Sequence, residues 1–266
     1  MITVGGWIAR ERGLDLLDRH LLLAELLRTD RAGVMTHPER VLEDAEKRTL
    51  DLWSSRRRQG EPIAYILGRK EFWGLTLAVN PTVLIPRPET ELLVECALEV
   101  ATADQRLLDL GTGSGAVAIA LARELDGAAV TASDVSQAAL KVAAANAAAH
   151  GARVTWVASN WFENLTPAFD AIISNPPYVA EGDAHLRSLE AEPTSALVSG
   201  AEGLDAIRYI VPAAKRFLND DGWLVVEHGH DHGRAVRSLM RYSGYRQVKT
   251  FRDLAGLERV TRGRRP

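Results

Sequence analysis

The feature that most constrains this chain is an apolar run that leads directly into a glycine-rich loop, LLDLGTGSG over residues 107–115. A buried strand that enters such a loop at the start of a helix is typical of open α/β sheets, because glycine lets the backbone approach a ligand closely. The loop residues expected at the ligand are Gly111, Thr112, Gly113, Ser114 and Gly115. A nucleotide-like cofactor is the natural occupant.

The pattern around the loop repeats along the second part of the chain. We expect strands at 106–110, 128–133, 154–158 and 171–174, and helices at 89–101, 115–124 and 136–149. Beyond residue 200 we expect helix 203–218, strand 223–227, helix 231–243, and an antiparallel hairpin from 245–251 and 257–261. Strands that alternate with helices predict an α/β, Rossmann-like domain with a mostly parallel sheet.

The first part of the chain has a different pattern of apolar residues. Apolar residues recur at helical spacing from about residue 12 to residue 60, which predicts a small all-α domain. Turn residues follow, and the segment FWGLTLAVNP at 72–81 resembles a short hairpin. The expected organisation is a helical substrate-recognition domain over 1–70, a β-hairpin linker over 71–85 and the α/β domain over 86–266.

Composition narrows the function classes. The 266 residues carry a net charge of −3, which argues against an affinity that rests mainly on many phosphate contacts, so no stable nucleic-acid binding is expected. The single cysteine, Cys96, excludes an internal disulfide and a multi-thiolate zinc site. No secretory signal and no apolar run long enough to cross a bilayer is evident, so we expect a cytoplasmic protein without a membrane partner.

An acidic residue supports the cofactor site. Asp134 ends the next expected strand, about twenty residues after the loop, where a carboxylate can accept both ribose hydroxyls of an adenosine. The loop alone is ambiguous, because Gly111, Gly113 and Ala116 also satisfy the relaxed fingerprint of dinucleotide-binding dehydrogenases. Other residues must therefore identify the chemistry.

The sequence Asn-Pro-Pro-Tyr at 175–178 follows the strand at 171–174, at the sheet edge where open α/β proteins bind ligands. Pro176 and Pro177 fix the turn and offer no N–H, so the turn presents acceptors to a substrate that brings N–H groups. If the Asn175 side-chain oxygen and the Pro176 carbonyl each accept one N–H, a planar amide or amino nitrogen is fixed toward a sulfonium methyl. The same acceptors stabilise the positive charge that develops on nitrogen.

Tyr178 completes the expected catalytic set with Asn175 and Pro176. Its ring can stack on the planar group and exclude water. Asn175, Pro176, Pro177 and Tyr178 together form the expected substrate site. A hydride-transfer reaction does not need a turn that carries acceptors and lacks donors. A methyltransferase that uses S-adenosyl-L-methionine is therefore favoured over a dehydrogenase.

With both motifs in view, the chain resembles the release factor glutamine methyltransferases, class I enzymes that modify the glutamine of the Gly-Gly-Gln motif in peptide chain release factors. The likeness covers nearly the whole length and includes GEPIAYILG at 60–68, LIPRPETE at 84–91, DLGTGSG at 109–115, NPPY at 175–178 and Glu192-Pro193. Asn-Pro-Pro-Tyr alone is shared with DNA adenine and ribosomal methyltransferases, whereas the helical domain and LIPRPETE are more specific to the release factor glutamine methyltransferases.

The resemblance implies roles for individual residues. Residues 111–115 would cradle the methionine part of S-adenosyl-L-methionine, Asp134 would bind its ribose, and Trp161 would lie along the adenine. Asn175 would bridge cofactor and substrate. One departure is Asn160, which stands before Trp161 where such proteins often carry an acidic residue, although an asparagine can still accept from an adenine amino group.

Two other readings stay open. A nucleic-acid methyltransferase acting on an adenine or guanine amino group shares the Asn-Pro-Pro-Tyr motif but would need a basic channel for a flipped base. A non-catalytic partner-binding module that kept the cofactor fold is the other alternative. The intact glycine loop and acceptor turn argue against that module.

Three further features of the sequence could be taken for functional sites. EHGHDH at 227–232 holds three histidines and two carboxylates, yet alternate residues at a strand end rarely converge on one ion, so no metal site is expected. The arginines at 56–58 and those of the tail, Arg262, Arg264 and Arg265, are expected to be solvated charges. Arg87 and Glu89 either cap the helix at 89–101 or border the cofactor.

Overall fold

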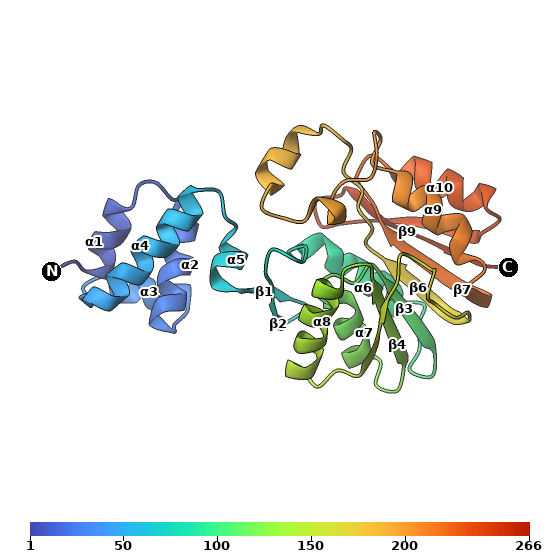
Figure 1. The fold of residues 1–266 in the computed structure, drawn as a ribbon, viewed down its shortest axis with the longest axis horizontal. Helices are drawn as coiled ribbons and strands as arrows, with labels where there is room; N and C mark the ends of the chain where they lie inside the picture. The colour runs from blue at the N-terminus through green and yellow to red at the C-terminus, as the bar shows by residue number, and fades with distance from the viewer. The chain divides into compact units, whose positions relative to one another are not determined.

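The computed structural model describes residues 1–266 and divides the chain into two compact units, Met1–Arg69 and Lys70–Pro266 (Figure 1). Each unit has a hydrophobic core of its own. None of the helices has the length and apolar character needed to span a bilayer.

The N-terminal unit is entirely helical. Its helices are α1 (Val4–Arg10), α2 (Leu16–Leu27), α3 (Arg31–Thr36), α4 (Asp44–Arg58) and α5 (Ile63–Leu67). Helix starts are capped by carboxylates: Asp15 accepts the backbone N–H of Asp18 at 2.7 Å, and Glu43 opens α4 with a capping box. Leu22, Leu23 and Leu50 form the centre of the core. Helix α1 begins before residue 12, where helical periodicity was first evident.

The arginines at the end of α4 are partly exposed, and each of them also forms an ion pair. Arg56 contacts Glu61 at 2.6 Å, Arg57 contacts Asp18 at 2.5 Å, and Arg58 contacts Glu11 at 2.8 Å. The tail arginines are paired as well, with Glu99, Asp221 and Asp220 in turn. Arg56 and Glu61 are close in the chain, but the other pairs join distant residues, which no local pattern reveals.

The second unit contains a seven-stranded sheet in the order β5-β4-β3-β6-β7-β9-β8 (Figure 1). Its strands are β3 (Arg106–Leu110), β4 (Ala129–Asp134), β5 (Val154–Ala158), β6 (Phe169–Ser174), β7 (Leu218–Glu227), β8 (Arg246–Arg252) and β9 (Glu258–Arg264). Strands β3 to β7 pair in parallel, while β9 runs antiparallel to both β7 and β8. The predicted mostly parallel sheet and the closing antiparallel hairpin are confirmed.

Helices cover both faces of this sheet, because successive strand residues point to opposite sides. The helices are α6 (Glu91–Leu98), α7 (Ala116–Glu124), α8 (Gln137–Ala149), α9 (Asp205–Ala214) and α10 (Gly233–Tyr242). Leu107 packs in a core with α6 and α7, whereas its neighbour Leu108 packs in another with α9 and α10. Helix α9 ends before the predicted residue 218, because Leu218 already belongs to β7, opposite Phe169.

Short elements complete the unit. They are β1 (Arg69–Phe72) and β2 (Leu75–Ala78), which form a two-stranded sheet, and the 3-10 helices η1 (Pro88–Thr90), η2 (Ala184–Leu189) and η3 (Thr194–Ala196). The helix predicted over 89–101 is thus divided into η1 and α6. Because β3, β4 and β6 are adjacent and parallel, their carboxyl ends bring the glycine loop, Asp134 and the Asn-Pro-Pro-Tyr turn to one edge of the sheet.

Candidate active site at the carboxyl edge of the sheet

The glycine loop is a compact turn between β3 and α7. Gly111, Gly113 and Gly115 adopt φ angles of +80°, +55° and +83°, a region that side chains rarely occupy. A Cβ atom on Gly115 would also lie 3.0 Å from the Cβ of Ala143 in α8. Both the backbone geometry and the close approach of α8 therefore require glycine at position 115.

Asp109 supports the loop from beneath. Its Oδ2 accepts the hydroxyl of Thr112 at 2.6 Å and the backbone N–H of Ala118 at 3.1 Å. The side chain is buried, and this burial raises the pKa of Asp109 to about 7. The carboxyl thus connects the loop to the first turn of α7 without reaching solvent.

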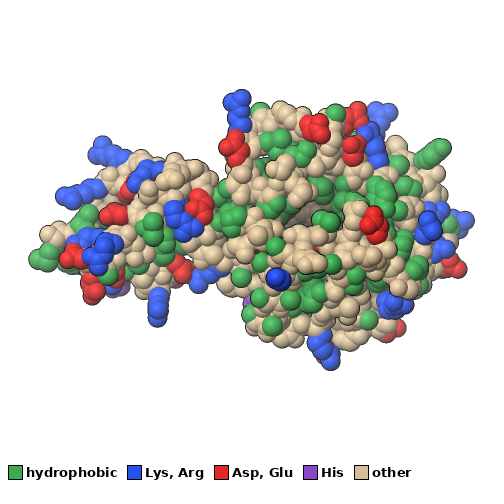
Figure 2. Space-filling model, viewed as in Figure 1, with side chains coloured by type: hydrophobic (Ala, Val, Ile, Leu, Met, Phe, Trp, Pro, Cys, Tyr) green, Lys and Arg blue, Asp and Glu red, His purple; other side chains and the backbone are tan.

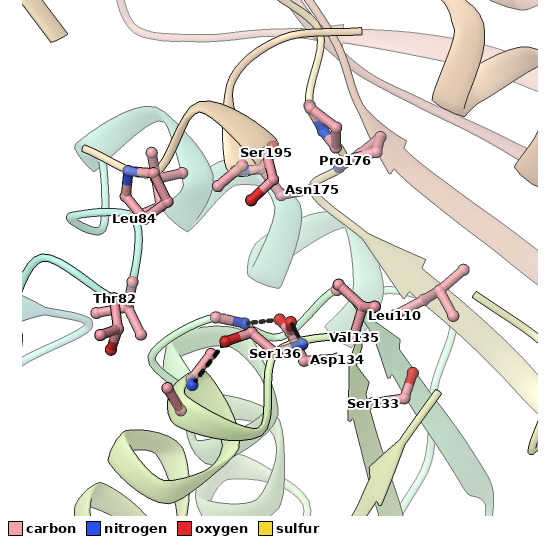
Figure 3. A pocket seen from close by; sticks show the side chains of 18 of the residues that line it. Thr82, Leu84, Leu110, Ser133, Asp134, Val135, Ser136, Asn175, Pro176 and Ser195 are labelled. Atoms are coloured by element: carbon pink, nitrogen blue, oxygen red, sulfur yellow. Dashed lines mark hydrogen bonds between the residues drawn. The ribbon is translucent and has the colours of Figure 1, made fainter. Parts of the chain in front are cut away.

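Asp134 occupies the end of β4 and faces the loop. Its two oxygens accept the backbone N–H groups of Gly113 at 2.9 Å and Ser136 at 2.8 Å. These bonds appear as dashed lines in Figure 3, where Asp134 and Ser136 lie on the opposite side of the cavity from Asn175 and Pro176. The carboxylate is half-buried, so it can also accept hydroxyl groups of a ligand.

The Asn-Pro-Pro-Tyr turn leaves the end of β6. Ser174 anchors it, since its hydroxyl donates to the Leu110 carbonyl at 2.7 Å. The side-chain N–H of Asn175 donates to the hydroxyl oxygen of Thr90 at 3.1 Å. The Asn175 Oδ1 is engaged by no hydrogen bond, and Asn175, Pro176 and Pro177 all line the cavity. The turn therefore leaves the Asn175 oxygen as an acceptor at the cavity.

Tyr178 lies on the other side of this turn. Its hydroxyl donates to Oε1 of Glu227 at 3.1 Å, and burial together with the nearby carboxylate raises the pKa of Tyr178 above its usual range. Tyr178 is not among the residues that line the cavity. Its stacking on a substrate amide stays a prediction.

Trp161 approaches the glycine loop from the segment after β5. Its ring lies 3.7 Å from the position that a Cβ atom on Gly111 would occupy, and its backbone has a φ of +49°. Asn160 is exposed and donates to Glu163 at 2.8 Å, while it also borders the cavity. The structure thus brings Trp161, the loop and Asp134 together around one space.

That space is a cavity of about 360 Å³. Its wall is formed by the glycine loop, the start of α8 and the acceptor turn. The segments 81–84, 159–161 and 193–196 complete it. In the space-filling view the visible face of this unit is hollowed, and apolar or uncharged atoms dominate around the hollow (Figure 2). A carboxylate, an aromatic ring and a glycine loop around one cavity fit the ribose, the base and the chain of an adenosine-containing cofactor. Thr112 and Ser114 line a smaller adjoining recess, whereas Gly115 lines neither space.

His228, in the histidine-rich segment that follows β7, has a structural role. Both ring nitrogens of His228 are engaged at 2.8 Å, one by the carbonyl of Gly229 and the other by the hydroxyl of Thr261. Burial lowers the pKa of His228 to about 4, so the ring is neutral at physiological pH. No group of three or more histidine, cysteine or carboxylate side chains converges on a common point that could hold a metal.

Several residues around the site were not among the catalytic and binding residues predicted from the sequence. Arg87 forms an ion pair with Glu192, which is buried and also accepts the backbone N–H of Ile85 at 3.1 Å. Thr90 and Glu227 lie behind the acceptor turn. Leu84, the first residue of the motif LIPRPETE, also lines the cavity, together with Thr82, Ser195 and Ala196. The sequence held a signal for three of these residues: Arg87 was one candidate to border the cofactor and lines the smaller recess, Glu192 belongs to the family resemblance, and Glu227 ends a strand beside the one that leads into Asn175.

Comparisons with known proteins place the chain among methyltransferases. Residues 88–243 match the family described as Methyltransferase small domain, and residues 9–68 match the PrmC N-terminal domain. The Release factor glutamine methyltransferase of Coxiella burnetii is 47% identical over 94% of this chain and 91% of its own length. The protein of the same name from Vibrio cholerae is 47% identical over 93% of this chain and 88% of its own length.

Solved structures agree on the fold. A methyltransferase from Pyrococcus furiosus has a TM-score of 0.56 at 18% identity and covers 79% of this chain and 96% of its own. A 16S rRNA methyltransferase from T. thermophilus, solved with AdoMet and guanosine, has a TM-score of 0.58 at 21% identity and covers 74% of this chain and 50% of its own. At these identities the likeness concerns the fold alone.

Proposed function

Since this chain belongs to the release factor glutamine methyltransferase family, we propose that it transfers a methyl group from S-adenosyl-L-methionine to the side-chain amide nitrogen of the glutamine in the Gly-Gly-Gln motif of peptide chain release factors. The observation that carries the proposal is the Asn175 side chain, whose N–H is held by Thr90 while its oxygen is left as an acceptor at the cavity. The near full-length identity to curated relatives of that name supports the substrate class.

The cofactor would be held by the loop and its neighbours. Asp134 would accept the ribose hydroxyls, Trp161 would lie along the adenine, and residues 111–115 would surround the methionine part. When bound, the cofactor supplies an electrophilic methyl group on a positively charged sulfur. The apolar and uncharged surroundings of the cavity would keep water away from that sulfur.

The acceptor turn would orient the substrate. The amide nitrogen of glutamine is a poor nucleophile because its lone pair is delocalised into the carbonyl. Asn175 Oδ1 and the Pro176 carbonyl would each accept one of its N–H groups and direct its out-of-plane lobe toward the methyl group. As the new bond forms, positive charge develops on nitrogen, and the same two oxygens stabilise it. The extra proton leaves the nitrogen after transfer, so no base is needed beforehand.

The N-terminal unit would recognise the release factor. This role is supported by its match to the PrmC N-terminal domain and by its separate core. Its ion-paired arginines leave less free positive charge than the sequence suggests, which favours a protein surface over a nucleic-acid backbone as its partner.

The decisive experiment measures transfer of labelled methyl from S-adenosyl-L-methionine to a purified release factor. The controls are the same factor with its Gly-Gly-Gln glutamine replaced, a DNA duplex and ribosomal RNA. Label on the unaltered factor alone is the expected result. Label on nucleic acid alone would overturn the substrate, and absence of both transfer and cofactor binding would support a non-catalytic module.

A further inference from the structure

Two segments of the cavity wall, 81–84 and 193–196, have no part in the chemistry described so far, and one buried carboxylate joins them. Glu192 lies in the loop between β6 and α9, and its side chain is 2% exposed. Its Oε2 accepts the backbone N–H of Ile85 at 3.1 Å, and its Oε1 forms an ion pair with Arg87. Glu192 therefore fastens its own loop to a segment that lies about a hundred positions earlier in the chain, 105 in the case of Arg87.

The two wall segments flank this contact directly. Leu84 immediately precedes Ile85, Pro193 immediately follows Glu192, and both Leu84 and Pro193 line the cavity. In Figure 3, Leu84 and Ser195 lie on the same side of the cavity as Asn175, across from Asp134. Residues 81–84 and 193–196 thus form a cover over the end of the cavity at which the acceptor turn lies.

The loop that carries Glu192 is continuous with the acceptor turn. Val179 follows the Asn-Pro-Pro-Tyr turn, and its backbone N–H donates to the Leu197 carbonyl at 2.8 Å, which closes the base of the loop. The backbone bonds that form η3 stay within the loop. The position of residues 193–196 is therefore fixed at one end by Val179 and at the other end by Glu192.

The chemistry of the Glu192 contact favours one arrangement of the cover. A buried carboxylate needs donors or a cation, and the N–H of Ile85 and the guanidinium of Arg87 supply both. Ile85 is itself buried. Without the carboxylate, a buried backbone N–H and a cation would both lack their acceptor, which favours movement of the two segments apart and toward water.

We propose that Glu192 is a positioning residue that holds the cover in the arrangement in which the substrate glutamine can reach Asn175. This inference rests on the proposed function, since it assumes that a glutamine side chain passes beneath the cover to the acceptor turn. Glu192 lines neither the cavity nor its adjoining recess, so it acts through the two segments and not by contact with a ligand.

The expected effect is on substrate binding more than on the transfer step. When a binding site is formed for only a fraction of the time, the apparent affinity falls by that fraction. If the cover is in place for about a tenth of the time without Glu192, KM for the release factor rises about tenfold, while kcat at saturation changes by less than about threefold. The Kd of S-adenosyl-L-methionine should also change by less than about threefold, because Asp134 and Trp161 belong to other segments of the wall.

The test compares Glu192→Ala and Glu192→Gln in the full-length protein. Alanine removes both contacts, so the full rise in KM is expected. Glutamine keeps the shape and one oxygen acceptor but removes the charge opposite Arg87, so a rise of about threefold is expected. Because the change to glutamine is the milder one, it keeps the comparison open if alanine prevents folding.

Asp253→Ala is the matched control. Asp253 lies between β8 and β9 with its side chain 8% exposed, accepts the backbone N–H of Leu257 at 2.9 Å and pairs with Arg259 at 2.9 Å. It makes the same kind of contact as Glu192 but lies outside the cavity. This variant should lose stability while its KM and kcat stay within about twofold of the wild type.

A second readout needs neither cofactor nor substrate. Hydrogen exchange followed by mass spectrometry should show faster exchange in segments 81–91 and 190–200 of the Glu192 variants, and in segment 250–262 of Asp253→Ala. If the wild type transfers no methyl group to a release factor, the proposed function fails, and the exchange rates still decide whether Glu192 holds the cover.

Four results would overturn the positioning role. They are unchanged exchange in segments 81–91 and 190–200, faster exchange spread evenly over the chain, an unchanged KM in the Glu192 variants of an active enzyme, and an equal rise of KM in Asp253→Ala.

Discussion

The side-chain nitrogen of Asn175 donates to the hydroxyl oxygen of Thr90 at 3.1 Å, although the two residues are 85 positions apart in the chain. Thr90 ends η1, and Asn175 follows β6. The contact joins the segment LIPRPETE to the turn NPPY, two motifs that carry the family resemblance. The acceptor at the cavity is thus oriented by a residue that no local pattern connects to it.

Loss of the acceptor should stop the chemistry. In Asn175→Ala the substrate nitrogen loses one of its two acceptors, so we expect kcat to fall by about 10³-fold in the methyl-transfer assay. Asn164→Ala is the control, because Asn164 is exposed and bonds to the Ala158 carbonyl outside the cavity. A kcat for Asn175→Ala that is comparable to that of Asn164→Ala would remove Asn175 from the mechanism.

Asp134 should matter for cofactor affinity. Asp134→Asn removes the charge and replaces one acceptor by a donor that faces the backbone N–H of Gly113 or Ser136. Titration calorimetry with S-adenosyl-L-methionine should show a Kd that is about 10- to 100-fold weaker, the cost of one or two charge-assisted hydrogen bonds. Asp126→Asn, an exposed carboxylate in the loop before β4, serves as the control and should bind normally. Equal affinity in both variants would contradict the ribose role.

Gly115 should tolerate no side chain. Gly115→Ala combines a positive φ with a Cβ that would lie 3.0 Å from Ala143, so we expect unfolding in denaturant to show a loss of about 2 to 4 kcal/mol. Gly182→Ala has a similar φ of +78° but open space around the added methyl group, and about 1 kcal/mol is expected there. Similar losses in the two variants would show that α8 yields to the added methyl group.

The buried carboxyls should make the protein less stable as pH rises. The folded pKa values of Glu227 and Asp109 are both about 7, above their ordinary values of 4.5 and 3.8. Between these limits the folded state binds more protons than the unfolded state, so the free energy of unfolding falls as pH rises. Glu227→Gln removes one of the two groups. The free energy of unfolding of Glu227→Gln minus that of the wild type should therefore increase by on the order of 3 kcal/mol between pH 5 and pH 8.

Unfolding curves recorded at several pH values test this relation. Glu190→Gln, a change at an exposed position, should leave the slope of stability against pH as in the wild type. If Glu227→Gln runs parallel to the wild type across the same range, Glu227 titrates at its ordinary pKa and the burial argument is wrong.

The sequence by itself determined the order of the elements and the edge at which the site forms. Apolar runs that alternate with helical patterns define a parallel sheet, and the rule that ligands bind at carboxyl ends of its strands then brings residues 111–115, Asp134 and Asn175 together. The donor-free nature of the turn was also evident, because proline lacks an N–H in any fold. These properties depend on residue type and on neighbours in the chain.

Only the tertiary structure decided which distant side chains meet. The contact of Glu227 with Tyr178, the pair of Arg87 with Glu192 and the pair of Arg57 with Asp18 join residues by packing across the fold. The histidine-rich segment shows the same limit, since His228 could be assigned a structural role only once its ring was seen between Gly229 and Thr261. Periodicity and propensity act over a few residues, whereas burial and hydrogen-bond direction depend on everything that surrounds a side chain after folding.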